Sequence, residues 1–186
     1  MKIKFRAKFF IVITLIITLF SSISIIASYT KINKIVKQST ESNIQSVEKM
    51  ALRYINDEYK GDWKVEGDKL LKGDAEINNN YRLVDKIKKD SKLEITIFKG
   101  YTRVVTTIIK NGKRAVGTKA VNEVIKTTLK QGKTYKGEVE ILNNMFDVEY
   151  TPIRDGNGKV IAMFFVGLQK QVMINQTNIS SWITKL

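Results

Sequence analysis

The sequence of 186 residues contains no cysteine and no histidine. Without cysteine the chain forms neither disulfides nor thiolates, so its fold depends on a hydrophobic core. Without histidine it lacks the side chain that most often transfers protons near neutral pH and most often binds metals. A Ser-His-Asp triad, a Cys-His pair and a His-rich metal centre are therefore excluded. We expect no enzyme and no metal or other cofactor, although chemistry based on Asp, Lys or Tyr stays open.

A charge-free apolar run of twenty residues extends from Phe9 to Ser28. This length matches the roughly 20 residues that a helix needs to cross a bilayer. Four cations precede the run and favour a cytoplasmic N-terminus: Lys2, Lys4, Arg6 and Lys8. The pattern predicts a cytoplasmic basic tail at 1–8, a transmembrane helix at 9–28 and a remainder outside the cell membrane.

A cleaved signal peptide is the competing interpretation of the same segment. Its n-region is also basic, and Ala27 is a small residue near a possible cleavage point. However, a typical h-region has only about 7–15 apolar residues, and Ile25 is a poor match to the small residue expected two positions before Ala27. The retained anchor is the favoured interpretation.

The formal net charge is +14, of which the four N-terminal cations contribute four, so the rest of the chain carries +10. Such a surplus is compatible with nucleic acid, anionic lipid or an anionic ligand. Nucleic acid is the least favoured partner, because the predicted topology separates this part from the genome and the sequence shows no zinc-ligand spacing or aromatic-basic motif.

A long amphipathic helix is predicted to follow the membrane span, from Tyr29 to about Tyr59. Its apolar residues recur mainly at steps of three and four: Ile32, Ile35, Val36, Ile44, Val47, Met50, Ala51, Tyr54 and Ile55. One stripe of such a helix can cover a sheet while another contacts a second subunit. We therefore expect a parallel homodimer through this helix.

The rest of the chain reads as an α+β domain with a five-stranded antiparallel sheet. Residues 61–80 are predicted to form a loop with a short ordered piece, and 81–91 a short helix. Alternation and β-branched residues predict strands at 93–98, 101–109, 135–142, 145–153 and 159–168, with turns at Asn111-Gly112 and Asn143-Asn144 and a helix at 118–130. A last amphipathic helix at 171–186 leads toward a second membrane span that the sequence does not contain.

Four segments carry a resemblance to a known family: Ile97–Thr107 (IFKGYTRVVTT), Asn111–Ala120 (NGKRAVGTKA), Gly132–Gly137 (GKTYKG) and Tyr150–Gly167 (YTPIRDGNGKVIAMFFVG). With the order of elements, they resemble the single Cache sensor domain, a PAS-like fold, of bacterial methyl-accepting chemotaxis proteins, over about residues 30–170. The resemblance implies an extracytoplasmic small-molecule sensor. Such a sensor normally lies between two membrane spans and is followed inside the cell by a signalling domain.

Two groups of residues are the first candidates for a ligand site. Strand alternation places Arg103 and Thr107 on one face of the strand at 101–109. A guanidinium matches a carboxylate geometrically, and the resemblance strengthens this role for Arg103. Thr118 at a helix start can cap the helix, while Arg114 and Lys119 bracket that start and add positive charge.

Tyr135 and Tyr150 on later strands complete the candidate site, because aromatic hydroxyls commonly line pockets, although core packing with a satisfied hydroxyl is slightly favoured for each. Together these residues predict a small anionic ligand, most simply a carboxylate. The leading function is a chemotaxis-type sensor module. The alternative is a pilin-like subunit, which also joins a membrane helix to a sheet domain, but the apolar run lacks the expected Gly-Phe cleavage site and early Glu.

Overall fold

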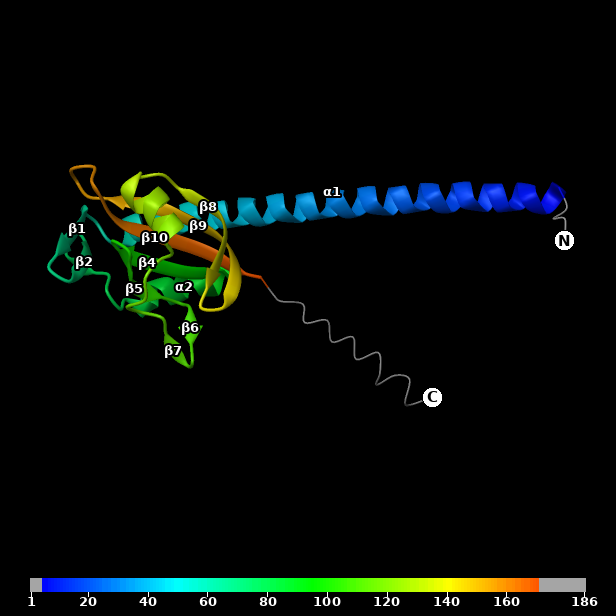
Figure 1. The fold of residues 1–186 in the computed structure, drawn as a ribbon. Coiled ribbons are helices and arrows are strands. Elements are labelled where there is room, and N and C mark those ends of the chain that lie inside the picture. The colour runs from blue at the N-terminus through cyan, green and yellow to red at the C-terminus, as the bar shows by residue number, and fades with distance from the viewer. Residues whose placement is uncertain (1–4, 171–186) are drawn as a thin grey trace. The chain divides into compact units, whose positions relative to one another are not determined.

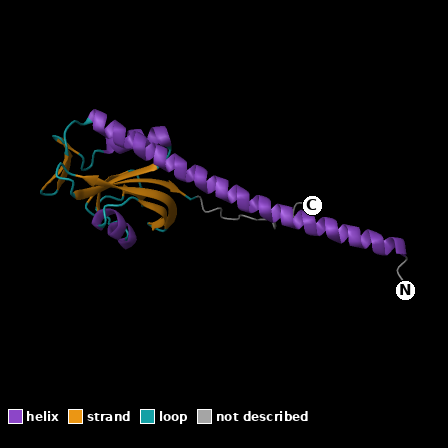
Figure 2. Ribbon diagram, turned by 90° about the horizontal axis from the view of Figure 1, so that it is seen from above, coloured by secondary structure: helices purple, strands orange, loops and turns teal. Residues whose placement is uncertain are grey.

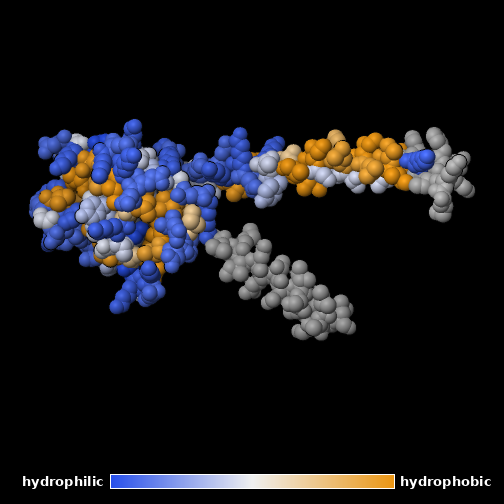
Figure 3. Space-filling view, viewed as in Figure 1, coloured by the Kyte–Doolittle hydropathy of each residue, from blue (hydrophilic) through white to orange (hydrophobic). Residues whose placement is uncertain are grey.

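The computed structural model describes residues 5–170, so the helix predicted at 171–186 lies outside the described residues. The chain divides into two units, residues 1–43 and residues 44–186. A single helix, α1 (Phe5–Glu58), contains the predicted membrane segment and the predicted amphipathic helix (Figure 1). Its N-terminal part is long and apolar enough to cross a membrane, and its apolar side chains are exposed (Figure 3).

The second unit is built on the predicted five-stranded antiparallel sheet, in the order β5-β4-β10-β9-β8. Its strands are β4 (Glu94–Lys99), β5 (Thr102–Thr106), β8 (Tyr135–Ile141), β9 (Asn144–Arg154) and β10 (Val160–Gln169). The central strand β10 is long and apolar, as expected for a strand covered on both faces. The α+β fold class is therefore confirmed.

Helices lie on both sides of this sheet (Figure 2), and a hydrophobic core fills the space on each face. The α1-face core joins α1 and α2 (Tyr81–Ser91) to the sheet, with Ile44, Val47, Ala51, Ile55, Leu83, Val84, Ile87, Ile95, Ile97 and Phe164 among its members. The η1-face core packs α3 (Asn122–Val124) and η1 (Ile125–Lys130) onto the opposite face, with Val124, Phe98, Ile141, Phe146, Val148, Tyr150, Met163 and Phe165 among its members.

The buried carboxylate of Glu149 lies on the α1 side of the sheet. Glu149 in β9 is 5% exposed, and its Oε1 lies 3.3 Å from Nζ of Lys136, the residue opposite it in β8. Burial raises the pKa of Glu149, the Lys136 ammonium opposes this shift, and the carboxylate of Glu48 in α1 adds to it.

The segment predicted as a loop at 61–80 instead forms a three-stranded sheet, with β1 (Trp63–Glu66), β2 (Lys69–Lys72) and β3 (Ala75–Glu76). The loop prediction was wrong here because the strands are short and the turns are rich in glycine and aspartate. A tight approach shapes the sheet: a Cβ on Gly73, whose φ is +59°, would meet the backbone oxygen of Lys60. Gly67 has a similar φ of +57° but open space around it.

The strand predicted at 101–109 is shorter than expected and contains a β-bulge. Ile97 pairs with Val105 and Phe98 pairs with Arg103, so Val104 has no partner of its own. The chain leaves the strand after Thr106. The Asn111-Gly112 turn is confirmed, but it closes a separate hairpin of β6 (Ile109–Lys110) and β7 (Lys113–Arg114), and both turn residues have positive φ.

The helix predicted at 118–130 begins later, at Asn122, and continues with the wider π-helical turn of η1. Residues 117–120, just before it, instead pair with β5 at the edge of the sheet. The N–H of Arg103 donates to the oxygen of Thr118, and the N–H of Gly117 donates to the oxygen of Arg103, each over 2.9 Å. This pairing satisfies the free edge of β5, which explains why 117–120 is extended rather than helical.

Candidate functional site

The extended segment at 117–120 brings Thr118 and Lys119 beside Arg103. Lys119 pairs with Thr102 in an antiparallel backbone β-bridge, and the N–H of Ala120 donates to the backbone oxygen of Tyr101 over 2.9 Å. Residues about fifteen positions apart in sequence are thus held together by backbone pairing. The proximity of Arg103, Thr118 and Lys119 was expected from the sequence, but the cause is an added edge strand and not a helix start.

The guanidinium of Arg103 is buried without a counter-ion. The residue is 3% exposed, and its Nη1 donates to Thr118 Oγ1 over 2.5 Å. Its Nε is buried and has no hydrogen-bond partner, and within residues 5–170 it forms no ion pair with a carboxylate. The guanidinium carbon lies 5.1 Å from the centre of the Phe98 ring. Unpaired buried charges are costly, so a ligand that supplies an acceptor and a negative charge would stabilise this arrangement.

The pKa values of Arg103 and its neighbour Tyr150 reflect this burial. Desolvation lowers the pKa of Arg103, and the nearby phenol of Tyr150 opposes the shift. Desolvation likewise raises the pKa of Tyr150, and the Arg103 charge opposes it. Arg103 stays charged at neutral pH because its ordinary pKa is so high. The site therefore offers a permanent positive charge in a poorly solvated place.

Arg103 and Tyr150 line a cavity of about 160 Å³ on the η1 face of the sheet. The complete lining is Arg103, Thr118, Lys119, Val121, Glu140, Ile141, Leu142 and Tyr150. Strand side chains alternate, so Glu140, next to Ile141 of the η1-face core, and Lys119, next to Thr118, are both directed away from Arg103. Lys119 is exposed, and its Nζ lies 5.3 Å from the centre of the Tyr101 ring. The buried charge of this cavity is thus that of Arg103.

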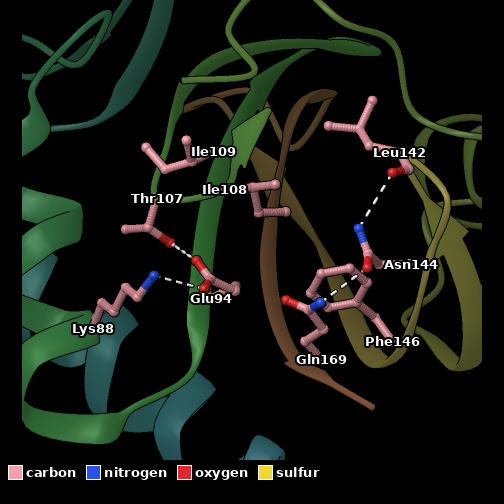
Figure 4. A pocket seen from close by; sticks show the side chains of 9 residues that line it. All are labelled: Lys88, Glu94, Thr107, Ile108, Ile109, Leu142, Asn144, Phe146 and Gln169. Atoms are coloured by element: carbon pink, nitrogen blue, oxygen red, sulfur yellow. Dashed lines mark hydrogen bonds and ion pairs between the residues drawn. The ribbon is translucent and has the colours of Figure 1, made fainter. Parts of the chain in front are cut away.

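Thr107 lies at a different place. Its hydroxyl donates to the Glu94 carboxylate, which also accepts from Nζ of Lys88 over 2.6 Å (Figure 4). These residues line a second cavity of about 160 Å³. The expected pairing of Arg103 with Thr107 on one strand was wrong, because β5 has a bulge at Val104 and ends at Thr106, and the two residues line different cavities.

Arg114 is committed to a structural ion pair. Its Nη1 and Nη2 donate to the two carboxylate oxygens of Asp85 over 2.9 and 2.8 Å, and Nη1 also donates to the oxygen of Thr106 over 2.8 Å. Its guanidinium stacks 4.4 Å from the centre of the Tyr81 ring. These contacts tie β7 to α2, so the geometry leaves Arg114 out of the cavity beside Arg103.

Thr118 does not cap a helix, contrary to the expectation. Its hydroxyl donates to the oxygen of Ala115 over 2.7 Å and accepts the bond from Arg103. The residue before Asn122 is Val121, which has no side chain able to cap, so α3 begins without a side-chain cap. The role of Thr118 is to hold one nitrogen of the Arg103 guanidinium in place.

The two predicted tyrosines are neighbours on β8 and β9. Their ring centres are 6.3 Å apart, edge to face, and Tyr150 also packs 4.9 Å from Phe165. Tyr150 lines the cavity, whereas Tyr135 stands behind it, where burial and the carboxylate of Glu123 raise its pKa. Sequence reasoning missed four lining residues: Val121, just before α3, and Glu140, Ile141 and Leu142, at the β8–β9 turn.

Comparison with known proteins gives one family. The model of the family described as single cache domain 3 matches residues 75–179, more than half of the chain. No curated protein matches the sequence. The matched segment contains α2, all five strands of the main sheet and every residue of the cavity lining. The chain belongs to the single Cache domain 3 family, a family of extracytoplasmic sensor domains.

Proposed function

We propose that this protein is the membrane-anchored, extracytoplasmic sensor module of a chemotaxis-type receptor and that it binds a small carboxylate beside Arg103 for transmembrane signalling. The observation that carries the proposal is the buried guanidinium with a free Nε and no counter-ion among the described residues. A carboxylate supplies both the missing acceptor and the missing negative charge.

The surroundings of Arg103 suit a small anion. Thr118 fixes one guanidinium nitrogen, the exposed Lys119 adds positive charge at the rim of the cavity, and the hydroxyl of Tyr150 offers a further polar contact. Phe98 and Tyr150 exclude water from one side, which strengthens each charged hydrogen bond. A cavity of about 160 Å³ holds a molecule of a few heavy atoms and not a peptide.

The test is a titration of the detergent-solubilised full chain. A thermal-shift screen of organic acids, amino acids and purines first identifies a ligand, because a bound ligand stabilises the folded state. Calorimetry then compares Arg103→Ala with Lys110→Ala, an exposed lysine beside the β6–β7 turn. One charged hydrogen bond is worth about 1.5–3 kcal/mol, so Arg103→Ala should weaken binding about tenfold or more. Equal affinities of the two variants would exclude Arg103 from the site. A ligand without a carboxylate would refute the proposal that the ligand is an anion.

The proposed membrane topology rests on the apolar N-terminal part of α1 and on the sensor family. The helix is a candidate span by length and composition, and single Cache domains are extracytoplasmic. Protease added outside intact cells, after removal of any outer barrier, should therefore degrade residues 44–170. Protection of that segment contradicts the topology. The family match favours this sensor over the pilin-like subunit.

A further inference from the structure

A strained two-residue turn joins β8 to β9. Ile141 pairs with Asn144, so Leu142 and Asn143 form the turn, not the Asn143-Asn144 pair expected from the sequence. Both residues have positive φ, +53° for Leu142 and +68° for Asn143. Asn tolerates this conformation, but a leucine side chain clashes with its own backbone there, and Gly or Asn is the usual choice. Leu142 therefore occupies a position that its own chemistry disfavours.

The side chain of Leu142 has a specific place in the molecule. Leu142 is half-buried, packs against the η1-face core and lines both the Arg103 cavity and the Thr107 cavity. Among the residues that line these two cavities, it is the one they share. Asn143 is exposed and lines neither cavity. A glycine or asparagine would form this turn with less strain, so the strained conformation is kept at the residue that lines both cavities.

We propose that Leu142 is the end wall of the ligand site and sets the maximum length of the carboxylate that binds beside Arg103. This inference rests on the proposed function. A ligand whose carboxylate meets Arg103 extends its apolar chain toward Ile141 and Leu142 and stops at the Leu142 side chain. Beyond that wall lies the second cavity, which has an apolar side formed by Ile108, Ile109 and Phe146 (Figure 4). The rest of its lining is polar: Lys88, Glu94, Thr107, Asn144 and Gln169.

The experiment uses two glycine variants of the same turn in the full chain. Leu142→Gly and Asn143→Gly both fit positive φ, so each relaxes the turn, but only Leu142→Gly removes a wall. Straight-chain monocarboxylates from acetate to octanoate are titrated into each protein by calorimetry. The longest acid that binds the wild type should also be the longest for Asn143→Gly. Leu142→Gly should bind acids two or more carbons longer at least tenfold more tightly than the wild type does.

An identical length limit in all three proteins overturns the inference, even when the acids bind. If none of the acids binds the wild type, the proposed carboxylate function has failed. The crystal structure of Leu142→Gly then tests separately whether the Leu142 side chain divides the two cavities. One continuous cavity from Arg103 to Ile108 supports the inference, and two separate cavities refute it. Leu142→Asn, which also tolerates positive φ, replaces the glycine variant if that variant does not fold.

Discussion

Replacing Arg103 with methionine should abolish carboxylate binding without destabilising the fold. The change removes one charged hydrogen bond to Thr118, worth about 1.5–3 kcal/mol, and a ring contact with Phe98, worth about 0.5–2 kcal/mol. It also removes the desolvation penalty of a buried ion with no counter-ion, which amounts to several kcal/mol. Methionine keeps the apolar stem. We therefore expect the free energy of unfolding to stay the same or rise by up to about 2 kcal/mol.

The matched control is Arg114→Met, because Arg114 is an arginine whose charge is paired. Loss of its two bonds to Asp85 and its bond to the Thr106 oxygen should lower the free energy of unfolding by about 1–3 kcal/mol. Ligand affinity should not change. Urea denaturation followed by circular dichroism measures stability, and calorimetry measures affinity. If Arg103→Met is the less stable variant and still binds ligand, then Arg103 is structural and the reasoning fails.

Three further predictions concern other parts of the chain. Glu149→Gln should flatten the pH dependence of stability. Because the pKa of Glu149 is raised in the folded state, the folded state binds more protons, and wild-type stability falls as the pH rises from the ordinary Glu range through the folded pKa. Thermal melts of both proteins from pH 4 to 8 measure the difference. Gly73→Ala should destabilise the domain more than Gly67→Ala, since both face the same positive-φ penalty of about 1–2 kcal/mol but only Gly73 meets backbone, and equal melting temperatures contradict this. Single cysteines along Tyr29–Tyr59 should crosslink two subunits in membranes at helical spacing, because Tyr29, Ile32, Ile35 and Val36 expose an apolar stripe; a flat profile argues against the homodimer.

The sequence was sufficient to predict the elements with strong periodicity. The apolar run and the three-to-four spacing after it predicted α1, and alternation predicted all five strands of the main sheet with boundaries correct to within a few residues. These signals are local, since each depends on which side of one element is buried. The short strands at 63–76 were missed because four-residue strands between glycine turns carry too little pattern.

The sequence also predicted Arg103, Thr118, Lys119 and Tyr150 as candidate site residues, and the structure places these four in the lining of one cavity. The sequence could not show that two other candidates, Thr107 and Arg114, lie outside this cavity. Whether Thr107 lines the same cavity as Arg103 depends on the bulge in β5 and on where β5 ends, and both are set only when β4 and β5 are paired in one register. Whether Arg114 is free depends on Asp85, a residue 29 positions earlier that reaches it through the packing of α2.

The amino-acid sequence by itself therefore determined the order of elements, the candidate membrane helix and the positive charge of the domain, because each is set by residues close together along the chain. Tertiary structure decided which of two arginines has no carboxylate counter-ion among residues 5–170. The packing of α2 pairs Arg114 with Asp85, whereas the pairing of residues 117–120 with β5 leaves Arg103 buried beside a cavity, with an Nε that has no hydrogen-bond partner. Tertiary structure also decided that Leu142, unremarked in the sequence, stands at the boundary of that cavity.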